Sequence, residues 1–264
     1  MGKVKKIILT SITEQGASEV EGMVVKELPL TIFLNDSELV TTLCSPVALD
    51  YLAIGILISE GLIDSMDEIK RLSVDAEKGV VNVETRADKQ IASRQLFKPL
   101  VASGGGKGAS SYSLAGSKNI IKVDSDVTIS TGEVSALVKD FLHRSSVYEK
   151  TRGVHSAALC DSRAILVFHD DIGRHNAIDK VFGDCLMNST SLLDHIIITS
   201  GRVSSEILLK VANRKIPILI SKAAPTDLGV ELAEKLGVTI IRFMRDKVLN
   251  VYSHDWRVVA DDRK

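Results

Sequence analysis

The sequence predicts an α/β fold (α+β over the whole chain), with a mostly parallel sheet in the C-terminal part and a smaller, antiparallel-leaning N-terminal part. Beyond residue 126, short apolar runs alternate with helical segments, a pattern typical of a parallel sheet covered by helices on both faces. Before that point, β-leaning runs occur in pairs around short polar turns, which is typical of hairpins. The chain is therefore predicted to divide near residue 125.

The N-terminal elements follow from turn and helix-boundary residues. Residues 1–22 have no clear period and predict a partly mobile lead-in. Four β-leaning runs form two predicted hairpins: 28–34 with 38–43, and 69–74 with 80–85. Between them, apolar residues at helical spacing predict a helix over 47–60, permitted by Pro46 and ended by Gly61. We assign 23–125 to this N-terminal α+β part.

The C-terminal part, 126–264, opens with a capping box, Ser130-x-x-Glu133, that predicts a helix through Arg144. Five apolar runs then predict strands over 154–159, 163–168, 195–199, 216–220 and 238–243. Helical patterns lie over 176–187, 204–214 and 227–236. We expect a C-terminal α/β domain built from these elements.

Composition limits the classes of function. The chain has 264 residues, 45% hydrophobic and 25% charged, with a net charge of −1, so we expect a soluble protein with no nucleic-acid or membrane partner. The longest apolar run, 52–58, is far shorter than a membrane span. Cys44, Cys160 and Cys185 have no metal-ligand spacing, so we expect no metal site, buried thiols and a reducing, cytoplasmic setting.

A glycine-rich segment, 101–111, lies within the N-terminal part and contains three consecutive glycines. Such a run cannot form core structure, and it predicts a mobile loop. The loop does not satisfy the phosphate-loop consensus, because Gly108 stands where a hydroxyl would bind magnesium. The residues alone therefore favour a flexible connection.

Polar and cationic residues follow four of the predicted strands. In an open parallel sheet, ligands bind beyond the carboxyl ends of the strands. The cations at these ends are Arg174, Arg202, Lys222, Arg245 and Lys247, accompanied by the hydroxyls of Ser200 and Thr226. Arginine forks and helix N-termini both favour phosphate, so the ends predict a site for an anionic, phosphate-bearing ligand. Asp170, Asp171 and Asp246 are expected to orient the arginines or to accept from a base or sugar.

Each of these residues also has a purely structural interpretation. Ser200 and Thr226 stand where helix caps are common, His155 fits an edge or core histidine, and His175 fits a residue that braces its loop. The motifs of zinc deaminases, serine hydrolases and dinucleotide-binding folds do not occur. Only the convergence of the four strand ends favours a binding site.

Several motifs, in order and nearly end to end, resemble the FdhD-type accessory sulfur carrier proteins of formate dehydrogenase. In the N-terminal part these are ELPLTI at 27–32 with Asn35, Ser45-Pro46, and IGILISEG at 54–61. In the C-terminal part they are GVHSAA at 153–158, DIGRHNAIDK at 171–180, SGR at 200–202 and APT at 224–226. Taken jointly, the motifs are highly specific.

The resemblance implies a sulfurtransferase-type carrier that takes sulfur from a cysteine desulfurase and passes it to the molybdenum cofactor of formate dehydrogenase. It implies a cytidine-deaminase-like C-terminal domain without zinc, a homodimer, and the formate dehydrogenase catalytic subunit as partner. It also implies a site for molybdenum bis(molybdopterin guanine dinucleotide), with GDP as a surrogate ligand. With the strand-end residues, the cofactor-binding candidates are Phe243, Met244, Arg245, Asp246, Lys247, Val248, Arg174, His175, Ser200, Arg202, Lys222 and Thr226.

The glycine loop departs from the family pattern. The family carries one or two cysteines in this loop, whereas here Gly105 stands where the first would fall. A persulfide needs a thiolate, so no catalytic residue is assigned. Three alternatives stay open: another cysteine serves, the chain delivers the cofactor as a chaperone without carrying sulfur, or the residue is altered in this sequence.

Overall fold

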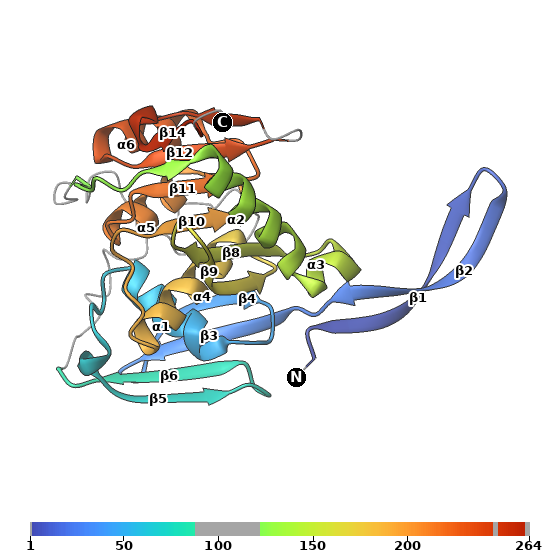
Figure 1. The fold of residues 1–264 in the computed structure, drawn as a ribbon. Coiled ribbons are helices and arrows are strands. Elements are labelled where there is room, and N and C mark those ends of the chain that lie inside the picture. Colours follow the sequence, from blue (N-terminus) through green and yellow to red (C-terminus); the bar gives the residue numbers. More distant parts are fainter. Residues whose placement is uncertain (1, 88–121, 245–247, 262–264) are drawn as a thin grey trace.

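The structure, a computed structural model, describes residues 2–87, 122–244 and 248–261, and two sheets form its framework (Figure 1). The larger sheet has six strands in the order β13-β12-β11-β10-β8-β9. Their bounds are β8 His155–Cys160, β9 Ile165–Asp171, β10 Ile196–Thr199, β11 Ile218–Ser221, β12 Thr239–Phe243 and β13 Leu249–Val251. The smaller sheet, β4-β3-β6-β5, comprises β3 Leu28–Leu34, β4 Ser37–Cys44, β5 Ile69–Asp75 and β6 Val80–Thr85.

Six α-helices accompany the sheets in the described part of the chain. They are α1 Leu49–Ser59, α2 Thr131–Arg144, α3 Ser146–Thr151, α4 Arg174–Met187, α5 Ser205–Asn213 and α6 Asp227–Leu236. The shorter elements are β7 Ile129–Ser130, β14 Val258–Val259 and the 3-10 turns η1 Met66–Glu68 and η4 Asp255–Arg257. None of the described helices combines the length and apolar character needed to cross a membrane. The predicted α/β class, α+β overall, is confirmed.

The six-stranded sheet is mixed, so the prediction of a mostly parallel sheet was wrong in this respect. Strands β10, β11 and β12 are parallel, whereas β8 pairs antiparallel with both β9 and β10, and β13 antiparallel with β12. The short turn after β8 requires the antiparallel pairing with β9, since only antiparallel neighbours can be joined so directly. Consequently β9, β10, β11 and β12 all end at the edge where β8 begins. We call this the carboxyl edge.

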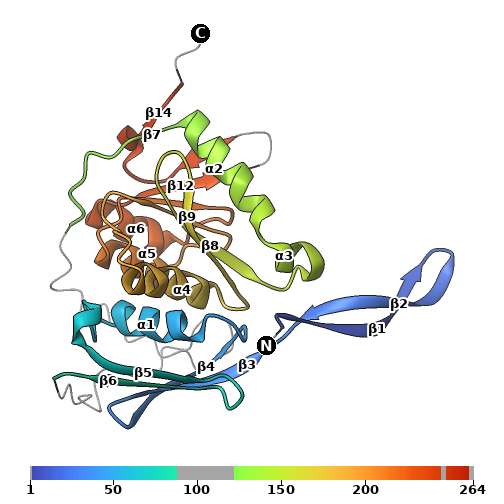
Figure 2. The same ribbon diagram turned by 60° about the horizontal axis from the view of Figure 1, so that its bottom comes forward.

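The expected irregular lead-in over residues 1–22 is instead an antiparallel hairpin. Strands β1 Val4–Thr13 and β2 Gly16–Val25 pair along their whole length and extend away from the rest of the molecule (Figures 1 and 2). Apolar side chains such as Ile8 and Ile12 are exposed on it. A hairpin that buries neither face has no two-residue pattern of hydrophobicity, which is why the sequence did not reveal it.

The N-terminal and C-terminal parts share one hydrophobic core. Figure 2 shows α1 between the four-stranded sheet and α4, and the core cluster joins Leu52 and Ile54 of α1 to Phe182 of α4. Two glycines allow the helix backbones to touch: a Cβ at Gly55 would overlap the Asp179 carbonyl oxygen, and one at Gly183 would meet the carbonyl of α1. This contact fixes the N-terminal part against the helix that leaves the carboxyl edge.

Helix α2 covers the other face of the six-stranded sheet. Its capping box is formed as predicted: Ser130 Oγ accepts from Glu133 N at 3.2 Å, and Glu133 Oε2 accepts from Ser130 N at 2.7 Å. Its buried residues Leu137 and Phe141 belong to a second core cluster on this face. The short α3 follows α2 directly and leads the chain to the carboxyl edge.

Candidate functional site

Hydrogen bonds join the strand ends at the carboxyl edge. Ser200 Oγ, just beyond β10, accepts from Ser156 N at 2.9 Å and lies 3.2 Å from His155 Nδ1 at the start of β8. Lys222 N, just beyond β11, donates to Thr199 O at 3.1 Å. Two of the four strand ends that the sequence predicted to converge, those of β10 and β11, are therefore held together, and the start of β8 with His155 joins them.

Two arginines approach each other at this edge. Arg174 is the first residue of α4 and is partly buried, while Arg202 follows β10 and is exposed. A Cβ on Gly201 would come within 2.8 Å of Arg174 Cβ, so the glycine lets the loop after β10 lie against the arginine stem. Burial, and then the positive charge of Arg202, lower the pKa of Arg174, with Glu206 opposing them. Two converging guanidinium groups favour an anion.

His175 follows Arg174 on α4 and lies deeper. Its Nε2 is 3.4 Å from Glu206 Oε2. Burial, reinforced by the charges of Lys210 and Arg174, lowers the pKa of His175 to about 3. The imidazole is therefore neutral at neutral pH, and the geometry suits bracing the start of α4.

A cavity of about 600 Å³ opens between α3 and the carboxyl edge. Its lining includes Phe141, Tyr148, Arg152, His155, Ser200 and Lys222. The ring of Tyr148 lies beside both Arg152 and Lys222. We call this cavity the α3 pocket. It brings together two of the predicted site residues, Ser200 and Lys222, with Phe141, Tyr148, Arg152 and His155, which the strand-end argument did not include.

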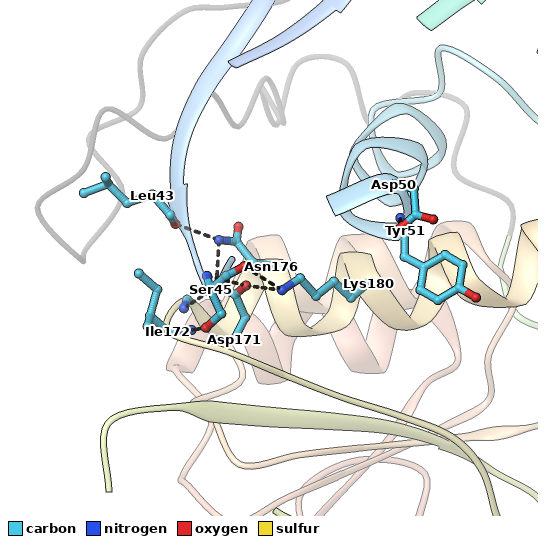
Figure 3. A network of polar contacts seen from close by, with 9 residues as sticks. Leu43, Ser45, Asp50, Tyr51, Asp171, Ile172, Asn176 and Lys180 are labelled. Atoms are coloured by element: carbon cyan, nitrogen blue, oxygen red, sulfur yellow. Dashed lines mark hydrogen bonds and ion pairs between the residues drawn. The ribbon is translucent and has the colours of Figure 1, made fainter. Parts of the chain in front are cut away.

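The acidic residues of the 170–180 segment serve the fold, which corrects the expectation that Asp170 and Asp171 orient arginines or face a ligand. Asp171 forms a fully buried ion pair with Lys180 at 2.6 Å and also accepts from the backbone N of Ser45 at 3.0 Å (Figure 3). Its second oxygen accepts from Asn176 Nδ2 at 3.0 Å. Asp170 accepts from two serine hydroxyls, at 2.6 and 2.8 Å. Through the contact of Asp171 with Ser45, the 170–180 segment connects the carboxyl edge to the N-terminal part.

A second buried ion pair is formed by Asp179, the residue that precedes Lys180 on α4. Asp179 accepts from Lys210 Nζ at 2.6 and 2.7 Å, and from the Ser59 hydroxyl of α1 at 2.6 Å. Burial raises the pKa of the Asp179 carboxyl, while Lys210 and Ser59 oppose the shift. Together with Asp171 and Lys180, this pair ties α1, α4 and α5 together beneath the carboxyl edge.

All three cysteines of the chain are buried. Cys44, Cys160 and Cys185 each have no exposed surface, and burial raises the pKa of each thiol to about 12. Nearby carboxylates add to the rise, Asp171 in the case of Cys44. A reactive thiolate needs exposure and a lowered pKa. The native structure disfavours all three as sulfur acceptors.

A family model described as FdhD/NarQ matches residues 25–259, most of the chain. The chain belongs to the FdhD/NarQ family. It is 43% identical, over 93% of its length and 94% of the relative's, to the sulfur carrier protein FdhD of Bacillus subtilis. It is 38% identical to the Staphylococcus aureus (strain MRSA252) protein of the same name, over 90% of both chains.

A solved structure supports the same assignment. The crystal structure of a Desulfotalea psychrophila protein assigned as a formate dehydrogenase accessory protein is similar to this fold with a TM-score of 0.77. The match covers 98% of this chain and 100% of that one, at 27% identity. The resemblance stated from the motifs is confirmed at the level of the family.

The remaining candidates of this FdhD/NarQ chain have different surroundings. Thr226 caps α6, its hydroxyl accepting from Gly229 N at 3.1 Å, as its structural interpretation predicted. Phe243 ends β12 and is buried in the core beside α2, whereas Met244 and Val248 are exposed. Arg245, Asp246 and Lys247 lie outside the described residues, as do Gly105 and the whole loop 101–111.

Sequence reasoning left three residues out of its candidate set. His155 reaches the edge because β8 is antiparallel to β10, an orientation that hydrophobic periodicity does not encode. Tyr148 lies on α3 and Arg152 is its C-cap; this six-residue helix is too short to show a period. A signal existed for α3: Ser145 precedes it, and its hydroxyl accepts from Tyr148 N as a helix cap.

Proposed function

We propose that this chain is an accessory protein of formate dehydrogenase that binds the guanine-dinucleotide molybdenum cofactor at its carboxyl edge. The observation that carries the proposal is the convergence there of Arg174, Arg202 and Lys222 with the Ser200 hydroxyl. Family membership supports formate dehydrogenase as the client enzyme, since the relatives are named sulfur carrier proteins and the solved homologue is assigned as a formate dehydrogenase accessory protein.

The donor set fits the phosphate and nucleoside portions of such a cofactor. Arg174 and Arg202 offer planar forks for phosphate oxygens, and Lys222 offers a point charge beside them. Within the described residues, no group of three or more His, Cys, Asp or Glu side chains is placed to ligate a metal, so the chain would hold the group through its phosphates. When bound, the molybdenum centre supplies the atom that accepts sulfur.

The chain's own residues bind and orient in this proposal. The neutral His175, whose Nε2 lies 3.4 Å from Glu206 Oε2, packs the first turn of α4 against α5 beside Arg174. Gly201 keeps the loop after β10 close against the same arginine. Buried ion pairs below the edge hold these elements at fixed spacing, which lowers the entropic cost of ordering the site on binding.

The chain has two alternative roles in the sulfuration of the cofactor. In the first, the chain receives sulfur from a cysteine desulfurase as a persulfide and passes it to the cofactor, which requires an accessible thiolate. In the second, it delivers the cofactor to the apo-dehydrogenase without carrying sulfur. The burial of Cys44, Cys160 and Cys185, with each pKa near 12, favours the second role for this sequence.

Intact-mass measurement after treatment with a cysteine desulfurase and cysteine separates the two roles. Delivery without sulfur predicts no added sulfur on the wild-type chain. A persulfide on any of the three cysteines would instead establish the carrier role. If the loop residue is altered in this sequence, Gly105→Cys will gain both a persulfide and the ability to activate formate dehydrogenase.

The nucleotide site is tested with GDP. A ligand that binds only the native state at 100 times its Kd stabilises that state by about 2.7 kcal/mol, so saturating GDP should raise the Tm by several degrees. Arg174→Ala should reduce this shift. An unchanged Tm for the wild-type protein in saturating GDP would contradict the site.

The family resemblance further supports a cytoplasmic homodimer whose partners are a cysteine desulfurase and the catalytic subunit of formate dehydrogenase. Analytical ultracentrifugation tests the dimer, with a monomer at micromolar concentration as the contrary result. Co-purification with the apo-dehydrogenase subunit tests the client.

A further inference from the structure

A second cavity, of about 640 Å³, opens at the edge of the six-stranded sheet opposite to the carboxyl edge. Its lining includes the loop 189–193 before β10, the end of α5 at 213–215 and the turn 64–67 before β5. We call this cavity the α5 pocket. Among the described residues it shares no lining with the α3 pocket, so a ligand bound in it does not occupy the proposed nucleotide site.

The guanidinium of Arg214, in the lining of this pocket, is mostly buried but weakly satisfied. Its Nε is buried, and nothing in the described part of the chain accepts a hydrogen bond from it. Its Nη1 lies 3.6 Å from Asp64 Oδ1, beyond hydrogen-bonding distance, and the Asp64 side chain is 82% exposed. Buried donors in native proteins are ordinarily hydrogen-bonded, and a carboxylate matches the planar fork of a guanidinium. The arginine therefore favours a ligand with a carboxylate.

Three helices end beside the α5 pocket, and their carbonyl ends favour a cation. Helices α1, α4 and α5 end at Ser59, Met187 and Asn213, and the last turn of each contributes to the lining. The C-terminus of a helix is equivalent to roughly half a negative elementary charge. Asp64 and Asp67 add carboxylates to the same lining. An ammonium group is therefore favoured here in addition to a carboxylate.

Other parts of the lining are apolar. Ile58 is buried in the main core, and Leu186 and Leu192 pack against that core. The volume of about 640 Å³ lies within the roughly 300–1,000 Å³ of small-molecule sites. Polar groups of both signs beside an apolar wall suit a ligand that carries a carboxylate, an ammonium and an apolar side chain.

We propose that the α5 pocket binds a zwitterionic ligand with an apolar side chain, either a free α-amino acid or a short peptide. Arg214, with the hydroxyls of Ser189 and Thr190, binds the carboxylate. The three helix ends and Asp67 bind the ammonium, and Ile58 contacts the apolar side chain. The assignment is independent of the proposed function, because it uses no residue of the carboxyl edge.

An NMR titration of the full chain with L-leucine tests the proposal, because amide shifts report both the Kd and the place of binding. We expect the largest shifts within 189–193 and 213–215. Leucinamide lacks the carboxylate and N-acetyl-leucine lacks the ammonium, so each should bind about 10-fold or more weakly than leucine. Equal affinity for leucinamide would overturn the role of Arg214, and equal affinity for N-acetyl-leucine would overturn that of the helix ends.

The dipeptide leucyl-leucine distinguishes the two sources of the ligand. Tighter binding of the dipeptide than of leucine supports a peptide, and tighter binding of leucine supports a free amino acid. The absence of shifts in the α5 pocket with leucine and with the dipeptide would overturn the proposal. GDP binding at the carboxyl edge is unaffected by that outcome, so the two sites are tested separately.

Variants identify the residue that holds the carboxylate. Arg214→Gln should weaken leucine binding by about 10-fold or more. Arg163→Gln is the matched control, because Arg163 is exposed and does not line the pocket, and it should bind as the wild type does. Unchanged ligand-free Tm values establish that both variants fold. Undiminished leucine binding by Arg214→Gln would overturn the assignment of the carboxylate.

A gain of affinity provides a test that damage to the fold cannot imitate. The bound carboxylate competes with Asp64 for Arg214, so Asp64→Asn should bind N-acetyl-leucine more tightly than the wild type does. N-acetyl-leucine is the appropriate probe, since it has no ammonium that Asp64 could attract. Weaker binding in Asp64→Asn would overturn the place given to the carboxylate.

Discussion

Replacing Lys180 by methionine tests whether the buried polar network, rather than apolar packing alone, fastens the carboxyl edge to the N-terminal part. Lys180 Nζ lies 2.6 Å from Asp171 Oδ2, and neither side chain has any exposed surface. Removing one partner of a buried pair leaves an uncompensated charge, which typically costs about 3–5 kcal/mol. Asp171 keeps donors from Ser45 N, Gly173 N and Asn176 Nδ2. We therefore expect a loss near the lower end, about 3 kcal/mol.

The free energy of unfolding is measured by urea titration followed by far-ultraviolet circular dichroism. A loss of about 3 kcal/mol is a large part of the roughly 5–15 kcal/mol that stabilises a typical domain. The double variant Asp171→Asn with Lys180→Met removes both charges and should be less destabilised than Lys180→Met alone. A matched control is Lys235→Met, which breaks an exposed pair with Glu231 of the same 2.6 Å length and should change little. A loss below about 1 kcal/mol in Lys180→Met would refute the reasoning, because it would equal that of a surface pair.

Three other predictions follow from the packing and the titrating groups. Gly55→Ala should lower the free energy of unfolding by about 1–3 kcal/mol or more, since the added Cβ meets a backbone carbonyl that cannot move aside; a neutral effect in urea titration would contradict the helix contact. The pKa of His175 is about 3 in the folded chain and 6.5 in the unfolded chain. Above pH 6.5 this difference does not reduce the free energy of unfolding. As the pH falls from 6.5 toward 3, the free energy of unfolding decreases by about 1.4 kcal/mol per pH unit. His175→Gln should flatten this decline between pH 7 and 5, and an unchanged slope would refute it. Cys44, Cys160 and Cys185 should all resist a thiol reagent at pH 8 in the native protein and all react in urea, so rapid native labelling of any of them would contradict their burial.

The regular elements were predictable where local chemistry determines them. The helix over 227–236 has the predicted bounds, because Thr226 caps its start and Gly237 ends it in the left-handed conformation. The capping box at Ser130 likewise fixed the start of α2. These signals act within four residues of the helix end and need no tertiary contact.

Strand direction and the exposed hairpin could not be predicted from the same patterns. A strand's apolar period is the same for parallel and antiparallel neighbours, so the antiparallel pairing of β8 with β10 was not predicted. The β1–β2 hairpin has no buried face and therefore no period. Both depend on long-range pairing, which local sequence patterns do not record.

The convergence of the strand ends could be predicted for a physical reason. Cations at strand ends pointed to the carboxyl edge, since topology brings such ends together wherever the strands run in the same direction. The role of each charged residue was harder to predict, because a buried structural carboxylate such as Asp171 and a carboxylate that faces a ligand look alike in sequence. Only the structure shows that Lys180 and Asn176 satisfy it.

The most direct test is to identify any nucleotide that co-purifies with the protein and is released when the protein is denatured. The wild-type chain, purified from cells that synthesise the molybdenum cofactor, is denatured, and the released small molecules are separated and weighed. We expect the amount of released guanine nucleotide to be proportional to the amount of wild-type protein. The Arg174→Ala variant, prepared in the same way, should release much less. Absence of any guanine nucleotide from wild-type protein, in cells whose formate dehydrogenase contains the cofactor, would contradict the central claim.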